Sequence, residues 1–253
     1  MIEIRKLHKR YGEKIAVHEL DLSVGVGEIF AFLGPNGAGK TTTIKILTGL
    51  VRPTSGSASV GGHDVVTAGL AAKALMSYVP DEPYLYDKLT AREFLRVVGE
   101  LYGLEKARVD ARVADLIAQF ELHEFIDNLC ESFSHGMKQR VVLAASLMHE
   151  PKLLVVDEPM VGLDPKSVRS LKDLFRKLAK EMGVTIFMST HTLSVAEEVA
   201  DRIGILSNGR LVALGTFPEL REIQAQRGEP GKQRLEDLFL DLTGGNGTQP
   251  HGA

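Results

Sequence analysis

The sequence has very little cysteine and no long apolar segment, and each shortage excludes a class of protein. Cys130 is the single cysteine among 253 residues, so no disulfide can form within the chain. We expect it to be a small buried hydrophobic residue in a reducing compartment. No apolar stretch approaches the roughly 18 residues that cross a bilayer, so any membrane association must come through a partner. Residues 1–6 alternate apolar and polar side chains, which predicts an edge strand without a signal-peptide core.

An excess of charge of one sign is also missing. The formal net charge is −3 and the isoelectric point is near 6.3, which argues against a broad nucleic-acid-binding surface but is compatible with a local basic patch. Hydrophobic residues make up 44% and charged residues 25%, as in ordinary globular proteins. The length fits one large domain or two small ones, with a substantial core that needs no disulfides.

The stretch from Gly34 to Thr41 matches the phosphate-binding pattern G-x-x-x-x-G-K-[ST] at every specified position. Its glycines are expected to allow the positive-φ backbone with which consecutive N–H groups converge on phosphate. Lys40 offers a charge to the β- and γ-phosphates, and Thr41 offers a hydroxyl to Mg²⁺. The residues that we expect to hold a nucleotide here are Gly34, Pro35, Asn36, Gly37, Ala38, Gly39, Lys40, Thr41 and Thr42.

The flanking sequence predicts an α/β fold around this loop. An apolar run at 28–33 indicates a buried strand, and 42–48 has the spacing of a helix, so strand, loop and helix follow in the required order. Further strands are predicted at 2–7, 15–24, 75–79, 153–158, 184–189, 202–207 and 210–214, with helices at 166–182 and 192–200. The 9–13 segment is predicted to be a turn that carries Tyr11, whose ring either stacks on a base or packs locally.

The middle of the chain changes to helical patterns. Thr90 and Glu93 form a capping box, and 108–120 places Val109, Val113, Leu116, Ile117 and Phe120 on one helix face. We therefore predict an α/β core at 1–88 and 151–220 with an inserted helical subdomain at 89–150. Residues 221–253 are predicted to form a polar helical extension that ends in a disordered, glycine-rich tail.

Two carboxylates end a strand that is apolar on both faces. Asp157 and Glu158 follow Leu153–Val156, and ligands of α/β sheets bind at the carboxyl ends of strands. Asp157 supplies the hard oxygen that Mg²⁺ prefers, opposite the hydroxyl of Thr41. Glu158 is then free to orient and polarise an attacking water molecule.

Together these stretches resemble the nucleotide-binding subunit of an ATP-binding cassette (ABC) transporter over residues 2–220. Residues 133–140 resemble the family signature, in which Ser134 and Gly136 match while His135 replaces a glycine and Met137 a glutamine. Ser134 is expected to cap a helix whose N-terminus binds the γ-phosphate. Residues 161–164 resemble the segment that crosses the dimer interface. By the same resemblance, His191 is the switch histidine at the γ-phosphate and Tyr11 is the adenine-stacking aromatic.

The sequence departs from the family at 80–83, where Asp81 stands in place of the usual glutamine. Asp81 either holds Mg²⁺ or its water by a different path or takes no part. The next residues, Tyr84, Leu85, Tyr86 and Asp87, resemble the surface that receives a membrane subunit, and they could equally serve subdomain packing.

The resemblance implies a P-loop NTPase fold, with a mixed RecA-like sheet and an antiparallel β subdomain, and ATP and Mg²⁺ as cofactors. It implies a dimer with an identical chain or a paralogue, contact with a permease through residues 81–87, and a peripheral location on the inner face of the cell membrane. The narrower resemblance is to subunits of bacterial ABC-2 exporters.

The alternative is a soluble ABC-type ATPase acting on nucleic acid or ribosomes, but residues 40–134 contain no coiled-coil heptads and the chain has one cassette. A GTPase would need an Asn-Lys-x-Asp motif, which is absent.

Overall fold

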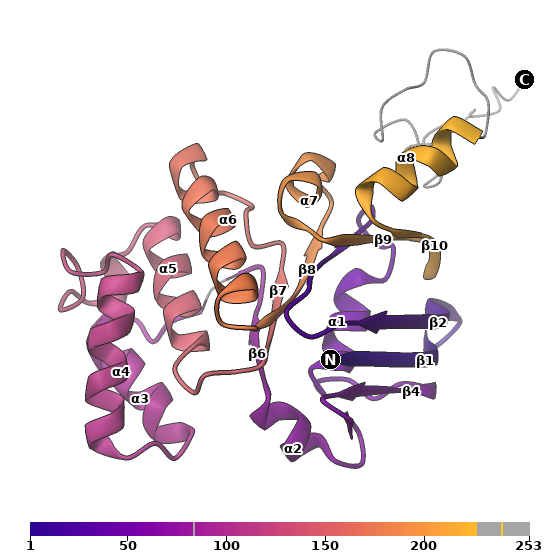
Figure 1. Ribbon diagram of the computed structural model, residues 1–253. Helices are drawn as coiled ribbons and strands as arrows, with labels where there is room; N and C mark the ends of the chain where they lie inside the picture. The colour runs from indigo at the N-terminus through magenta and orange to yellow at the C-terminus, as the bar shows by residue number, and fades with distance from the viewer. Residues whose placement is uncertain (83, 227–238, 240–253) are drawn as a thin grey trace, which may run out of the picture.

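The computed structural model describes residues 1–82, 84–226 and 239 and contains two β-sheets flanked by helices (Figure 1). The strands are β1 (Ile2–Tyr11), β2 (Lys14–Val24), β3 (Ile29–Leu33), β4 (Ser55–Val60), β5 (His63–Asp64), β6 (Met76–Val79), β7 (Leu153–Asp157), β8 (Thr185–Thr190), β9 (Arg202–Ser207) and β10 (Arg210–Gly215). The helices are α1 (Lys40–Leu47), α2 (Gly69–Ala74), α3 (Ala91–Leu101), α4 (Lys106–Gln119), the 3₁₀ turn η1 (Cys130–Ser132), α5 (His135–Ser146), α6 (Pro165–Lys180), α7 (Leu193–Val199) and α8 (Phe217–Gln226).

The larger sheet has the order β10-β9-β3-β8-β7-β6, in which β10 runs antiparallel to β9 and the other neighbours are parallel. Strands β3, β7 and β8 are buried along their whole length. Successive side chains alternate between two cores, because the side-chain period of a strand is two. On β7, for example, Leu154 and Val156 join one core and Leu153 and Val155 the other. This explains the unbroken apolar run before Asp157.

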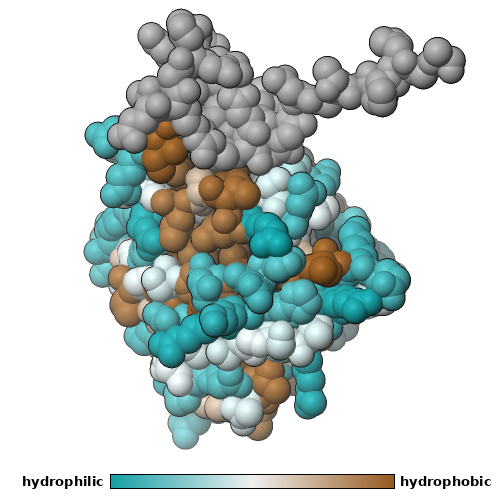
Figure 2. All heavy atoms as spheres, turned by 90° about the vertical axis from the view of Figure 1, so that its right-hand side faces the viewer, coloured by the Kyte–Doolittle hydropathy of each residue, from teal (hydrophilic) through white to brown (hydrophobic). Residues whose placement is uncertain are grey.

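The smaller sheet is antiparallel, with the order β2-β1-β4-β5. Its inner face packs on the larger sheet and on α1 in a shared core, where the Phe187 ring stacks on Phe30 with centroids 5.5 Å apart. Its outer face is turned to solvent, as the alternating burial along β1 and β2 shows. Figure 2, a view from the right-hand side of Figure 1, shows a hydrophobic area just below the grey atoms with mainly hydrophilic atoms around it. The mixed sheet and the antiparallel sheet confirm the predicted fold class.

The helices α3, α4 and α5 lie together beside β6 and β7 (Figure 1). The predicted capping box is confirmed at the start of α3, where Thr90 accepts the N–H of Glu93 and the Glu93 carboxylate accepts that of Thr90. The apolar face predicted for α4 is buried, and Cys130 is buried as well. These side chains continue the core that covers one face of the larger sheet, so the helical segment is packed on the α/β part.

Several boundaries differ from the prediction. β1 continues to Tyr11, so the hairpin turn consists of Gly12 and Glu13. The predicted turn at 9–13 was wrong, because the pairing of β1 with β2 extends to Tyr11 and Lys14. The short helix α2 had no clear signal in the sequence. Most of the 221–253 extension, including its glycine-rich tail, lies outside the described residues. Within the described part of the chain, no helix is long and apolar enough to cross a membrane.

Candidate functional site

A cavity of about 290 Å³ opens beside the phosphate loop. It brings together residues from β1, the 35–42 loop region, the end of β6 and the end of β7. Its lining residues are Tyr11, Lys14, Ala16, Pro35, Asn36, Gly37, Gly39, Lys40, Thr41, Thr42, Asp81, Asp157 and Glu158. Of the residues expected in the phosphate loop, Gly34 and Ala38 do not line this cavity, and Ala38 is buried beneath it.

The loop glycines have different local reasons for lacking a side chain. Gly37 and Gly39 have positive φ values of 80° and 108°, as expected. Gly34 does not, so a positive φ there was a wrong expectation. Its constraint is close packing, because a Cβ at residue 34 would lie 2.5 Å from the carbonyl oxygen of Leu206. The loop is therefore shaped both by its own turns and by the backbone of β9, to which Leu206 belongs.

Lys40 begins α1 and lies almost fully inside the loop. Its ammonium group donates to the carbonyl oxygen of Gly34 at 2.7 Å and lies 3.4 Å from that of Pro35. It also pairs with Glu158 Oε1 at 3.4 Å. The cation is thus fixed at the base of the cavity, next to the carboxylates at the end of β7.

Asp157 is 2% exposed and points to the sheet face on which α1 packs, because it shares its parity with Leu153 and Val155. In the parallel register it lies beside Ser189, whose hydroxyl donates to Asp157 Oδ1. Oδ2 is buried without a partner among the described residues. Burial raises the pKa of Asp157, while the hydroxyls of Ser189 and Thr41 act to lower it. An unpaired buried carboxylate oxygen of this kind is available to a cation.

Glu158 follows with φ of 46°, a left-handed conformation that is uncommon outside glycine. Its N–H donates to the Ser189 hydroxyl at 3.1 Å, which holds the turn in place. Its Oε2 lies 3.0 Å from Nδ1 of His191 and accepts the His191 N–H at 3.3 Å. Since an ionised carboxylate only accepts, the contact places the ring proton on Nδ1. Glu158 therefore lies between Lys40 and His191 at the mouth of the cavity.

Asp81 and Tyr11 form the outer walls of the cavity. Asp81 is exposed, and its charge adds to burial in raising the pKa of Asp157. Burial, together with the charges of Asp157 and Asp81, raises the pKa of Tyr78 to about 12. The ring of Tyr11 is half exposed and carries the ammonium of Lys9 at 4.7 Å from its centroid. The residue lines the cavity beside the phosphate loop.

The signature residues do not line this cavity. Ser134 caps α5 as expected, with its hydroxyl accepting the N–H of Met137 at 3.4 Å. Gly136 lies in the first turn of α5, and a Cβ there would be 3.9 Å from Leu163 Cδ2. The ring of His135 lies against Gly162, close enough that a Cβ at 162 would be 3.4 Å from it. Within one chain, the signature thus packs on the 161–164 segment and is separate from the phosphate loop.

The surface expected to receive a membrane subunit is only partly exposed. Tyr84 and Tyr86 are exposed, with rings 5.9 Å apart. Leu85 is buried in the core that the helical segment shares with the sheet, so its place on that surface was a wrong expectation. Two tyrosines remain available there.

Sequence reasoning did not identify Ser189, whose hydroxyl donates to the Asp157 carboxylate and accepts the backbone N–H of Glu158. Ser189 has no motif of its own, and the signal that could have found it is the pairing of β8 with β7. Lys14 and Ala16 were also missed as lining residues, because they enter the site from the paired strand β2.

Comparison with known proteins places these features in a family. The family model described as ABC transporter matches residues 17–161, more than half of the chain, and a model described as AAA domain, putative AbiEii toxin, Type IV TA system matches residues 127–197. The linearmycin resistance ATP-binding protein LnrL of Bacillus subtilis is 40% identical over 87% of this chain and 70% of that protein. The bacitracin transport ATP-binding protein BcrA of Bacillus licheniformis is 37% identical over 88% of this chain and 72% of that protein.

Solved structures agree. An ATP-binding subunit of an ABC transporter superimposes with a TM-score of 0.85 at 34% identity, covering 96% of this chain and 99% of that chain. The dimeric ATP-binding cassette MJ0796, bound to ADP and Pi in a post-hydrolysis state, superimposes with a TM-score of 0.77 at 25% identity, covering 85% of this chain and 98% of that chain. The chain therefore belongs to the ABC transporter family, as an ATP-binding cassette that hydrolyses ATP in the service of transport.

Proposed function

We propose that ATP binds in the cavity beside the phosphate loop and that Glu158 acts as the general base in its hydrolysis. The arrangement of Glu158 between Lys40 and His191, one residue after the buried Asp157, carries this proposal. Lys40 donates to neutral carbonyl oxygens of the loop, and an ionised phosphate oxygen is the stronger partner for an ammonium group. The half-exposed ring of Tyr11 offers a stacking surface to adenine.

Mg²⁺ fits the residues at the end of β7. Asp157 Oδ2 is a buried carboxylate oxygen without a partner among the described residues, and the Thr41 hydroxyl lies close enough to affect the pKa of Asp157. Asp157 and Thr41 would hold the ion, with Asp81 in reach of its water shell. No cluster of three or more histidine, cysteine or acidic side chains suited to a metal occurs in the part of the chain that is described. This agrees with an ion that takes most of its ligands from substrate phosphates and water. When bound, Mg²⁺ neutralises charge on the β- and γ-phosphates.

Glu158 has the surroundings that a general base needs. Its side chain is 15% exposed, so solvent reaches it, while the Nδ1–H of His191 and the ammonium of Lys40 fix its position. Its carboxylate accepts the proton of the attacking water. His191 holds the Glu158 carboxylate at the cavity mouth. From there the His191 ring can respond to the presence or loss of the γ-phosphate.

The second half of the site is proposed to come from another cassette. Ser134 and Gly136 lie at the start of α5, outside the cavity of their own chain. Closing two chains head to tail would place this helix N-terminus on the γ-phosphate bound by the partner. The dimeric MJ0796 cassette is a related precedent. Whether the second cassette is an identical chain or a paralogue is open to test.

We propose further that the chain works under a membrane permease on the inner face of the cell membrane, with residues 81–87 as the contact. The exposed rings of Tyr84 and Tyr86 support this surface. Export is favoured over import because relatives carry names such as linearmycin resistance and bacitracin transport.

For the organisation of the chain, we propose an ATP-binding core at 1–88 and 151–220 and a signature subdomain at 89–150, followed by an extension at 221–253. No nucleic-acid partner is proposed.

The test is Glu158→Gln in the full chain. We expect ATP binding to remain and hydrolysis to fall by about 10²- to 10⁴-fold, because a neutral amide cannot accept the proton. Size-exclusion chromatography with ATP should then show a stabilised dimer. Glu197→Gln, an exposed change on α7, serves as the matched control and should behave as wild type. A Glu158→Gln protein that stays monomeric with ATP and hydrolyses it at the normal rate would contradict the proposed role.

A further inference from the structure

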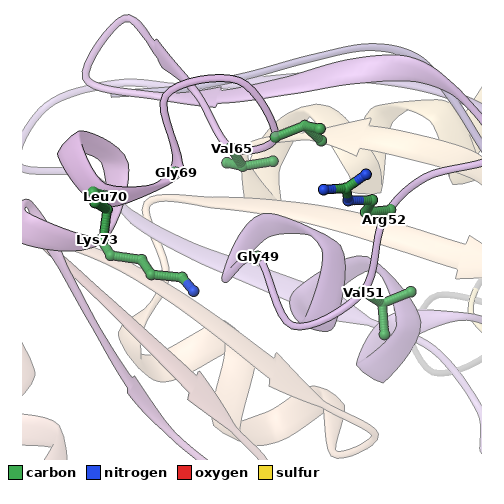
Figure 3. A pocket seen from close by; sticks show the side chains of 8 residues that line it. Gly49, Val51, Arg52, Val65, Gly69, Leu70 and Lys73 are labelled. Carbon is green, nitrogen blue, oxygen red and sulfur yellow. The ribbon is translucent and has the colours of Figure 1, made fainter.

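A second cavity lies between α2 and the segment that follows α1, and it shares no lining residue with the nucleotide cavity. Its volume is about 310 Å³, and its lining residues are Gly49, Val51, Arg52, Val65, Val66, Gly69, Leu70 and Lys73. Figure 3 shows the side chains of Lys73 and Arg52 reaching into the space from opposite walls. None of the lining residues is acidic. The cavity is therefore lined by two cationic side chains and otherwise by apolar residues and glycine.

Both walls are held by hydrogen bonds, so the cavity is formed in advance. On one wall the N–H of Val51 donates to the carbonyl oxygen of Lys45 at 3.0 Å. On the other, the Asp64 carboxylate accepts the N–H groups of Val66 and Thr67 at 2.9 and 2.8 Å. These bonds lower the pKa of Asp64, with the Thr67 N–H as the largest cause. Asp64 is thus occupied by the backbone and is not an ion-pair partner of the cavity cations.

The two cations have no acidic partner in the described part of the chain. No ion pair is formed by Arg52 or Lys73 there. Lys9 brings another positive charge near Arg52 without lining the cavity, because its ammonium donates to the carbonyl oxygen of Arg52 at 2.8 Å and lies over the ring of Tyr11. The stem of Lys73 packs over Gly49, where a Cβ would lie 3.1 Å from Lys73 Cε. A local excess of positive charge thus occurs in a chain with a net charge of −3.

Large apolar side chains face solvent at this cavity, where Val66 and Leu70 line it, and beside it, where Leu50 lies between the lining residues Gly49 and Val51. Leu70 is 88% exposed, Leu50 is 60% exposed and Val66 is 40% exposed. Scattered exposed leucines are ordinary, but three apolar side chains grouped around unpaired cations are not. Cations that bind phosphate beside apolar groups that enter the acyl boundary are the chemistry of an anionic membrane surface.

We propose that this cavity binds the phosphate of an acidic phospholipid, with Arg52 and Lys73 as its ligands and Leu50 and Leu70 in contact with the acyl region. The proposal rests on the proposed function, because a permease would hold the cassette at the membrane and keep the local lipid concentration high. α2 lies at the opposite end of the molecule from α8 (Figure 1), so the described C-terminal helix does not cover the cavity. The lipid would help to orient the cassette under its permease.

The test measures binding of the full chain to vesicles at low salt, without nucleotide or permease. Vesicles of phosphatidylcholine alone are compared with vesicles containing about 30 mol% phosphatidylglycerol, by co-sedimentation. Two cations near an anionic surface contribute about 1 kcal/mol each, so we expect roughly 30-fold tighter binding to the anionic vesicles. Arg52→Gln with Lys73→Gln should abolish that preference. Lys106→Gln with Arg169→Gln removes the same charge from exposed sites elsewhere and should preserve it.

Each result of the vesicle experiment either supports or contradicts lipid binding by this cavity. Equal binding to both vesicles, or an equal loss in both double variants, would overturn the proposal. Equally tight binding of soluble glycerol phosphate that displaces the vesicles would assign the cavity to a free anion, and binding only in the presence of a membrane subunit would assign it to a protein. ATP hydrolysis by the Arg52/Lys73 variant is expected to be unchanged, because neither residue lines the nucleotide cavity. A failure of lipid binding would therefore leave the proposed ATPase mechanism standing.

Discussion

Ser189→Ala is expected to destabilise the protein strongly, although Ser189 belongs to no recognised motif. Its hydroxyl donates to Asp157 and accepts the N–H of Glu158, and the residue is fully buried. A hydrogen bond to a charged group contributes about 1.5–3 kcal/mol, and a buried group left unpaired costs about 1–3 kcal/mol. Because the two losses share one hydroxyl, we expect the free energy of unfolding to fall by about 2–4 kcal/mol.

The loss should depend on pH in a known direction. Burial raises the folded-state pKa of Asp157, so its contribution to stability is present at low pH and is lost as the pH rises through that pKa. The Ser189 hydroxyl lowers the same pKa, and removing it raises the pKa further. The destabilisation by Ser189→Ala should therefore be larger at about pH 8, with Asp157 ionised, than in acid.

Urea unfolding followed by circular dichroism measures this effect. Ser146→Ala is the matched control, because among the described residues the Ser146 hydroxyl bonds only the Leu143 carbonyl of its own helix, at 2.7 Å. Alanine is the better helix former, so the control should change stability by less than about 0.5 kcal/mol. If Ser189→Ala unfolds like Ser146→Ala, or if its effect is the same at both pH values, the assigned hydrogen bonds are not the ones that hold the site.

Three further predictions concern the cavity. Gly34→Ala should destabilise the protein more than Gly37→Ala, because only the new Cβ at residue 34 would strike a backbone oxygen. Gly37→Ala should cost about 1–2 kcal/mol of backbone strain. Equal free energies of unfolding for the two variants would contradict this. Tyr11→Ala should weaken ATP binding, measured by calorimetry, by roughly 5- to 150-fold, because base stacking contributes about 1–3 kcal/mol. Tyr11→Phe keeps the aromatic ring and should bind ATP normally. Equal binding by both variants would exclude stacking. Asp81→Asn should impair transport in reconstituted vesicles more than basal hydrolysis, and an unaltered transport rate would remove Asp81 from the site.

Much of the fold could be predicted because its signals are local. The apolar runs of β3, β7 and β8 and the capping box at Thr90 depend on neighbouring residues, and the structure places these elements within a few residues of their expected bounds. The end of β1 was misplaced because pairing with β2 overrides the turn preference near Gly12. Leu85 was misplaced for a similar reason, since its burial depends on the packing of distant helices.

The candidate site was predictable where one segment supplies the geometry. Most of the phosphate loop lines the cavity together with Asp157 and Glu158, whereas Gly34 and Ala38 do not. The reason for glycine at position 34 was not predictable, because it lies in the carbonyl of Leu206, far along the chain. Ser189 depends in the same way on the register between β7 and β8, which no property of residues 185–190 reveals.

The two strand-end carboxylates also show how a change of one residue along the chain separates two tasks. Asp157 keeps the strand conformation, so its side chain enters the buried face beside α1, where burial raises its pKa and one oxygen stays unpaired. Glu158 leaves the strand with φ of 46°, and this turn carries its side chain out to Lys40 and His191. Ser189 bonds both residues and fixes the angle between them. In the proposed mechanism, a cation ligand and a general base can then be neighbours in sequence without competing for the same space.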